Sequence, residues 1–131
     1  MTIHLTIIGI SLIALGLVHI IFPNYFKWKS ELSSLSLINR QMMYVHTFFI
    51  ALMLLLIGIL CIWGSNEIVS TSLGKKLSLG LGIFCAIRLL FQFVVYSKKL
   101  WFGKLFETIV HYFFVCYWGY LSGIFLIIWG Q

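Results

Sequence analysis

The chain of 131 residues is 62% hydrophobic and only 9% charged, and its formal net charge is +6. A typical soluble domain carries about 25% charged residues and about 45–50% apolar ones. A domain of this length buries only about two-thirds of the surface that its unfolded chain exposes, so a water-soluble core has no room for so much apolar area. The composition therefore excludes a soluble enzyme, a nucleic-acid-binding module and a disordered segment, and it predicts a protein whose partner is the lipid bilayer.

Four apolar runs are each long enough to cross a bilayer as a helix. The hydrocarbon core is about 30 Å thick and needs about 20 helical residues. Strands are excluded because the runs are too long, and because four strands close no barrel that satisfies their backbone groups in lipid. The sequence predicts an all-α integral membrane protein, a four-transmembrane-helix bundle in a single domain of residues 1–131, with spans at about residues 3–22, 42–63, 77–96 and 106–129.

The connection between the first two spans is more than a linker. Pro23 directly follows the first apolar run and is expected to end its helix. Residues 30–38 then space their apolar side chains as a short helix lying in the membrane interface would, and an ordered loop is the alternative. The connection between the second and third spans, residues 65–74, is short and polar and is expected to be a plain linker.

The basic residues predict the orientation of the chain. Cytoplasmic loops of membrane proteins carry an excess of lysine and arginine. The middle connection holds Lys75 and Lys76, whereas the other two connections hold Lys27, Lys29, Arg40, Lys98, Lys99 and Lys104. We therefore expect loops 1 and 3 to face the cytoplasm and both termini to lie outside a cytoplasmic (inner) membrane.

Several polar side chains interrupt the spans at one predicted depth near the cytoplasmic side. Polar groups inside a membrane are costly and mark functional positions. Because successive helices alternate in direction, residues far apart in sequence reach the same depth, and all four spans contribute. Residues four apart share a helix face. Arg88 lies one turn deeper than the others, and Tyr96 continues the stripe of Arg88 and Gln92 towards water. The members of this predicted polar layer are His19, His46, Arg88, Gln92, Tyr96, Glu107 and His111.

The first interpretation of the polar layer is a metal or haem site. Imidazole is a common ligand for iron, zinc and copper, and two facing histidines can hold haem b axially. His19, His46 and His111 would be the ligands, with Glu107 as a fourth ligand or a supporting group. Such a site would serve redox or hydrolytic chemistry on a membrane substrate. Arg88 opposes a bare cation, because its guanidinium stays charged.

Two other interpretations remain open. In one, Arg88, Gln92 and Tyr96 are fixed donors that bind an anionic lipid or a quinone oxygen, and a histidine beside Glu107 exchanges a proton. In the other, the protein is a non-catalytic accessory or structural subunit of a larger membrane complex. Arg88 then pairs with Glu107, and the remaining polar groups hydrogen-bond across helices.

Small residues in the fourth span predict a close helix contact. Gly119 and Gly123 form a G-x-x-x-G pattern, which lets two helix backbones approach. We expect this contact to lie inside the monomer, and a homo-oligomer through the same pair is the alternative.

Overall fold

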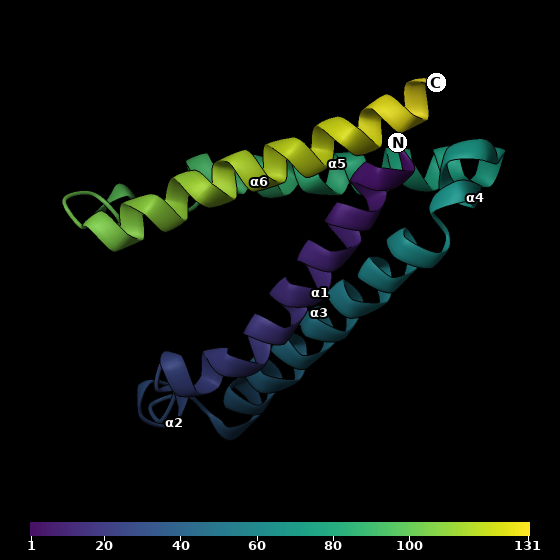
Figure 1. Ribbon diagram of the computed structural model, residues 1–131. Coiled ribbons are helices and arrows are strands. Elements are labelled where there is room, and N and C mark those ends of the chain that lie inside the picture. The colour runs from purple at the N-terminus through teal and green to yellow at the C-terminus, as the bar shows by residue number, and fades with distance from the viewer. The chain divides into compact units, whose positions relative to one another are not determined.

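The computed structural model describes residues 1–131, and all of its regular elements are helical. Four helices are long and apolar enough to cross a membrane: α1 (Thr2–Tyr25), α3 (Leu37–Trp63), α5 (Ser72–Val94) and α6 (Leu105–Gly130). Three short elements lie between them, namely α2 (Trp28–Glu31), α4 (Ser65–Ser70) and the 3-10 turn η1 (Lys98–Leu100). Figure 1 follows these elements in chain order. The predicted all-α class with four long helices is confirmed.

The chain divides into two compact units, residues 2–65 and residues 66–131 together with Met1. The first unit contains α1 packed along α3, and the second contains α5 packed along α6 (Figure 1). Each unit is thus a helical hairpin, and each is described by itself below. The association of the two hairpins into a single bundle stays a prediction.

The α1–α3 hairpin is held by glycines that bring two backbones into contact. A Cβ atom added to Gly9 would lie 2.6 Å from the carbonyl oxygen of Gly58, and one added to Gly58 would lie 2.7 Å from that of Gly9. About two turns along α1, a Cβ on Gly16 would lie 3.0 Å from the carbonyl oxygen of Ala51. Helices in lipid associate through such close van der Waals packing of small residues.

The α5–α6 hairpin makes its close contact at Gly82. A Cβ atom there would lie 2.8 Å from the side chain of Leu126, and the buried hydroxyl of Ser122 donates to the Gly82 carbonyl at 3.0 Å. A Cβ on Gly119 would find one ordinary contact at 3.9 Å, and one on Gly123 would find nothing within 4 Å. Within the α5–α6 hairpin, therefore, Gly119 and Gly123 make no close helix contact, and their packing against the other hairpin stays a prediction. A homo-oligomer through this pair stays a prediction.

The first helix continues past the proline that was expected to end it. Pro23 lies in the last turn of α1, where its missing N–H costs only one hydrogen bond of the helix. The helix then closes with the amide of Phe26, which donates to the carbonyl of Phe22 at 2.9 Å. The chain turns at Lys27, whose φ of 52° lies in the left-handed region.

The connections also differ from their predicted form. The short helix in this connection is Trp28–Glu31 and not residues 30–38, because the chain turns after Glu31 and Leu37 already begins α3. Its place in the membrane interface stays a prediction. Its indole packs edge-on against the ring of Tyr44, with ring centroids 5.4 Å apart. The middle connection is not a plain linker, since it contains α4.

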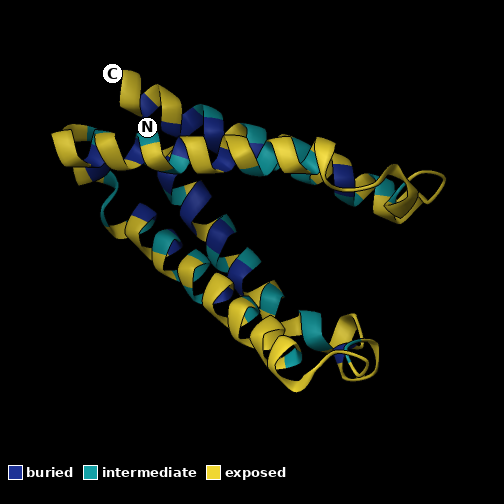
Figure 2. Ribbon diagram, turned by 180° about the vertical axis from the view of Figure 1, so that it is seen from behind, coloured by how far each residue is buried: buried dark blue, intermediate teal, exposed yellow.

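The outer faces of the long helices are apolar and exposed. The most apolar window of each long helix is only 17% to 33% buried, and Figure 2 shows exposed residues along all four helices. Apolar surface of this extent is unfavourable in water and suits acyl chains. The chain is a multi-pass membrane protein.

Candidate functional site

The predicted polar layer is shared between the two hairpins. His19 on α1 and His46 on α3 belong to the first unit. The second unit holds the other five residues, namely Arg88, Gln92, Tyr96, Glu107 and His111. Four of these five, all except Glu107, make side-chain hydrogen bonds that gather at the end of the hairpin near η1.

His111 is the most enclosed of the seven residues, with 7% of its surface exposed. It lies in the second turn of α6, and the amide nitrogen of Gln92 in the last turn of α5 lies 3.0 Å from its Nδ1 atom. An amide nitrogen can only donate, so Nδ1 accepts and the ring proton resides on Nε2. The hydrogen bond ties the two helices together and leaves His111 with an N–H to offer to a further acceptor.

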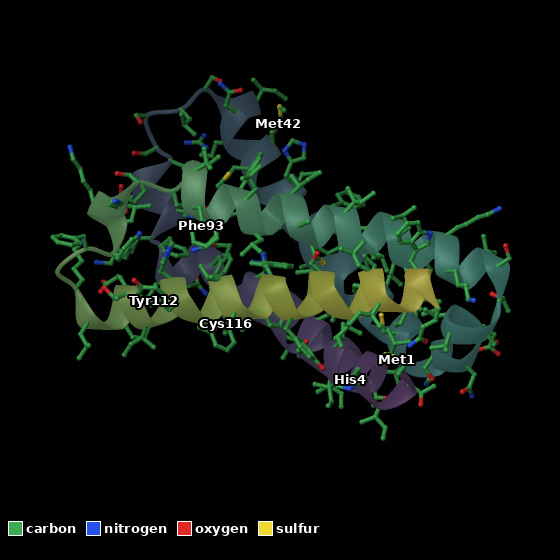
Figure 3. All side chains as sticks on the ribbon, turned by 90° about the horizontal axis from the view of Figure 1, so that it is seen from above. Met1, His4, Met42, Phe93, Tyr112 and Cys116 are labelled. Atoms are coloured by element: carbon green, nitrogen blue, oxygen red, sulfur yellow. The ribbon has the colours of Figure 1, made fainter.

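Aromatic rings surround His111. The indole of Trp101 stacks on the imidazole, with ring centroids 4.5 Å apart and planes 12° from parallel. The rings of Phe93 and Tyr112, both labelled in Figure 3, meet the imidazole edge-on at 6.5 Å and 5.5 Å. The carbonyl of Trp101 accepts from the hydroxyl of Thr108 at 2.6 Å, which fixes the connection against α6. The Trp101 indole thus forms a flat, apolar surface beside the polar imidazole of His111.

Arg88 lies among neutral aromatic groups. Its guanidinium carbon is 5.6 Å from the ring centroid of Trp118 and 5.8 Å from that of Tyr96. One of its nitrogens donates to the Tyr96 hydroxyl oxygen at 3.4 Å. Ring faces attract a cation through their quadrupole, more strongly when water is excluded. Because the Tyr96 oxygen accepts from Arg88, the Tyr96 O–H remains able to donate to another group.

The predicted pairing of Arg88 with Glu107 is not formed. Gln92 is level with His111, whereas Arg88 lies one turn from that level and Glu107 one turn from it in the opposite direction. The two residues are therefore separated by about 12 Å along the helix axis, which is beyond the reach of the guanidinium. Arg88 finds its partner in Tyr96 instead, and Glu107 is exposed.

After the contacts between α5, α6 and Tyr96 are made, several side chains still have hydrogen-bond donors without an acceptor. Arg88, Gln92, Tyr96 and His111, called the donor cluster below, leave unused N–H groups on the guanidinium, the O–H of Tyr96 and the Nε2–H of His111. The buried indole N–H of Trp118, beside Arg88, has no acceptor. A buried donor without a partner is costly. An acceptor oxygen is the chemical group that would complement all of them.

The histidines of the first unit have different surroundings. The Nδ1–H of His19 donates to the carbonyl of Leu15 at 2.7 Å, and its ring packs on Phe22 with centroids 4.6 Å apart. His46 is exposed on α3. Within neither hairpin do three or more histidine, cysteine, aspartate or glutamate side chains gather as a metal ion would require. The metal or haem site draws its ligands from both units and stays a prediction.

Sequence reasoning missed two members of the site region. Trp101 lies next to Phe102 in a short connection, where aromatic residues are ordinary at a membrane surface, so the sequence carries no signal of its contact with His111. Trp118 lies in an aromatic stretch of the fourth span that hydropathy does not distinguish from lipid-facing surface, yet it is buried beneath Arg88. Comparison of the chain with protein-family models, with curated proteins and with solved structures finds no match.

Proposed function

We propose that the protein binds a membrane-soluble ligand through an acceptor oxygen, either the carbonyl of a quinone or the anionic head of a lipid, at the donor cluster of the α5–α6 hairpin. The observation that carries this proposal is the guanidinium of Arg88, which stands on a membrane helix with a phenol and an indole as its partners. An arginine inside a membrane helix is costly, by about 2.5–3.5 kcal/mol at the centre of the span and by less towards its end, where Arg88 lies. A negatively charged or strongly polarised oxygen offsets that cost.

The other members of the donor cluster shape the preference for the ligand. The O–H of Tyr96 and the Nε2–H of His111 add two neutral donors of fixed direction. The stacked rings of Trp101 and His111 add a flat flank. A quinone uses all of these features, since it has a planar ring and two carbonyl oxygens. An anionic lipid uses chiefly the charge of Arg88.

Substitution of Arg88 tests this function. We expect the full chain in detergent to bind decylubiquinone or phosphatidylglycerol, and Arg88→Leu to weaken binding by at least about tenfold, because hydrogen bonds to charged groups contribute about 1.5–3 kcal/mol. Isothermal titration calorimetry with each probe measures the affinity and shows which of the two ligand classes is bound. For phosphatidylglycerol, both chains also carry Lys27→Gln and Lys29→Gln, so that a second basic site on the α1–α3 hairpin does not contribute.

The control removes a lysine from the same helix. Lys76→Leu deletes one positive charge from the exposed first part of α5 and should leave the affinity for the bound probe within about twofold, since exposed charges contribute little at ordinary salt. Binding of neither probe to the unmodified chain, or equal affinity of Arg88→Leu and the unmodified chain, would reject the proposed function.

A metal or haem site is the second candidate function. The observation that favours it is the hydrogen bond of the His19 Nδ1–H to a backbone carbonyl, because metal-ligating histidines usually donate their other N–H in this way. The Nε2 lone pair of His19 is then oriented and available. His46, His111 and Glu107 would complete a site for iron, zinc, copper or haem b, serving redox or hydrolytic chemistry.

A visible spectrum and elemental analysis of the purified chain test this candidate. We expect a Soret band, or near-stoichiometric iron, zinc or copper, that is lost in His46→Ala and retained in His4→Ala at the opposite end of α1. A colourless and metal-free protein would contradict the candidate. If that protein also co-purified with other membrane subunits, the accessory-subunit interpretation would be favoured.

A further inference from the structure

A shallow, open hollow of about 530 Å³ lies within the α1–α3 hairpin, at the elbow between α1 and α2. Its walls are formed by Pro23, Asn24, Lys27, Lys29 and Ser30, called the elbow residues below. The hollow begins in the last turn of a membrane span, and the next residues, Tyr25 and Phe26, are exposed. Aromatic residues at the end of a span occupy the headgroup level of a bilayer. The elbow is therefore placed where lipid headgroups are.

The backbone of the elbow is strained at a lysine. Lys27 is the one non-glycine residue with positive φ, at φ 52° and ψ 46°. Glycine adopts this conformation without steric cost, whereas a side chain at Cβ opposes it. Non-glycine residues in this region are held by their surroundings and concentrate at functional sites. Lys27 follows the end of α1, where a left-handed residue is a common way to close a helix, and here a lysine stands where glycine is usual.

Hydrogen bonds and one buried ring hold the elbow rigid. The Lys27 carbonyl accepts from the backbone amides of Ser30 and Glu31 at 3.1 Å and 2.9 Å, and from the Ser30 hydroxyl at 3.0 Å. Trp28 is buried and packs against Tyr44, which fastens α2 to α3. These contacts engage the backbone and the Ser30 hydroxyl. No hydrogen bond within the elbow engages the side chains of Lys27, Lys29 and Asn24, which are exposed residues that line the hollow.

The charges at the elbow favour an anion. Lys27 and Lys29 both line the hollow and are exposed, whereas Glu31, the nearby carboxylate on α2, is not among the lining residues. We propose that the elbow binds the phosphodiester of an anionic phospholipid, with the two ammonium groups and the Asn24 amide as donors. Basic residues next to a membrane span attract anionic lipid heads. This site belongs to the α1–α3 hairpin and does not depend on the proposed function.

Lipid binding to the full chain in detergent, followed by native mass spectrometry, tests the site. The probes are phosphatidylglycerol, phosphatidylcholine of the same chain length, and inorganic phosphate. We expect Lys29→Gln to weaken phosphatidylglycerol binding about fivefold and Lys27→Gln with Lys29→Gln about twenty-five-fold, with phosphatidylcholine binding unchanged. Arg88→Leu serves as the background for all variants, so that binding at the donor cluster does not contribute.

Two further variants separate charge from conformation. Lys75→Gln with Lys76→Gln removes the same charge from the other hairpin, and phosphatidylglycerol affinity is expected to stay within about twofold. Lys27→Gly relieves the backbone strain and should keep or raise the unfolding temperature while it weakens phosphatidylglycerol binding about fivefold. The proposal is overturned if the elbow variants keep full affinity, if the Lys75 and Lys76 variant loses as much, or if inorganic phosphate binds as tightly as the lipid.

Discussion

Replacing Gly58 with alanine is expected to destabilise the chain by about 1–3 kcal/mol, which is the usual cost of forcing an extra carbon into a well-packed contact. The new Cβ would lie 2.7 Å from the carbonyl oxygen of Gly9 and 2.8 Å from the side chain of Ile13. The first of these atoms belongs to the backbone, so the overlap can be removed only if α1 and α3 move apart where Gly9 faces Gly58. The small-residue packing that holds the hairpin in lipid is then reduced.

Thermal unfolding of the full chain in detergent, followed by circular dichroism, measures this effect. Gly80→Ala is the matched control, because it is also a glycine within a long helix and its Cβ would meet nothing within 4 Å. Alanine is the better helix former by about 1 kcal/mol, so the control should keep or raise the unfolding temperature. Equal changes of the unfolding temperature in the two variants would show that the contact of Gly9 with Gly58 does not hold α1 to α3.

Replacing Trp28 with alanine is expected to release α2 from the hairpin. Trp28 is 7% exposed although it lies in a helix of only four residues, and truncation of a buried tryptophan to alanine costs about 3–5 kcal/mol. A single turn of helix has no stability of its own. The loss should therefore appear as local unfolding of the connection, with α1 and α3 retained.

Hydrogen exchange reports this local change. The amides of Glu31 and Leu32 donate to the carbonyls of Lys27 and Trp28 at 2.9 Å each, and we expect their protection to be lost in Trp28→Ala. Trp63→Ala is the control, because Trp63 is 84% exposed at the end of α3. Retained protection of both amides in Trp28→Ala would mean that other contacts hold the elbow.

The positions of the spans could be predicted from the sequence, but the helix ends and connections could not. Hydropathy summed over about 20 residues identifies a span whatever its neighbours are. The end of α1 depended instead on a hydrogen bond that forms beyond Pro23. Helix α3 begins at Leu37, more than one helical turn before the predicted start of the span at residue 42. Such local choices each involve only about 1 kcal/mol and are decided by packing.

The sequence predicted the members of the candidate site that follow one another along α5, but not the contacts that these residues make with α6. Helical spacing placed Arg88, Gln92 and Tyr96 on one face of the third span, but α5 ends at Val94, and Tyr96 reaches Arg88 from the chain just beyond the helix. The partners supplied by α6 depend on the register of the hairpin. That register brings His111 to Gln92 and keeps Glu107 away from Arg88.

The sequence by itself determined the solvent of this protein, the number of its membrane helices and the polar stripe on the third of them. Those properties follow from side-chain transfer energies and helix periodicity, which are local quantities. The tertiary structure decided that backbones touch at Gly9 and Gly58 and that Arg88 is held by aromatic rings. These contacts require the rotation and register of two helices, and packing of complementary surfaces sets both.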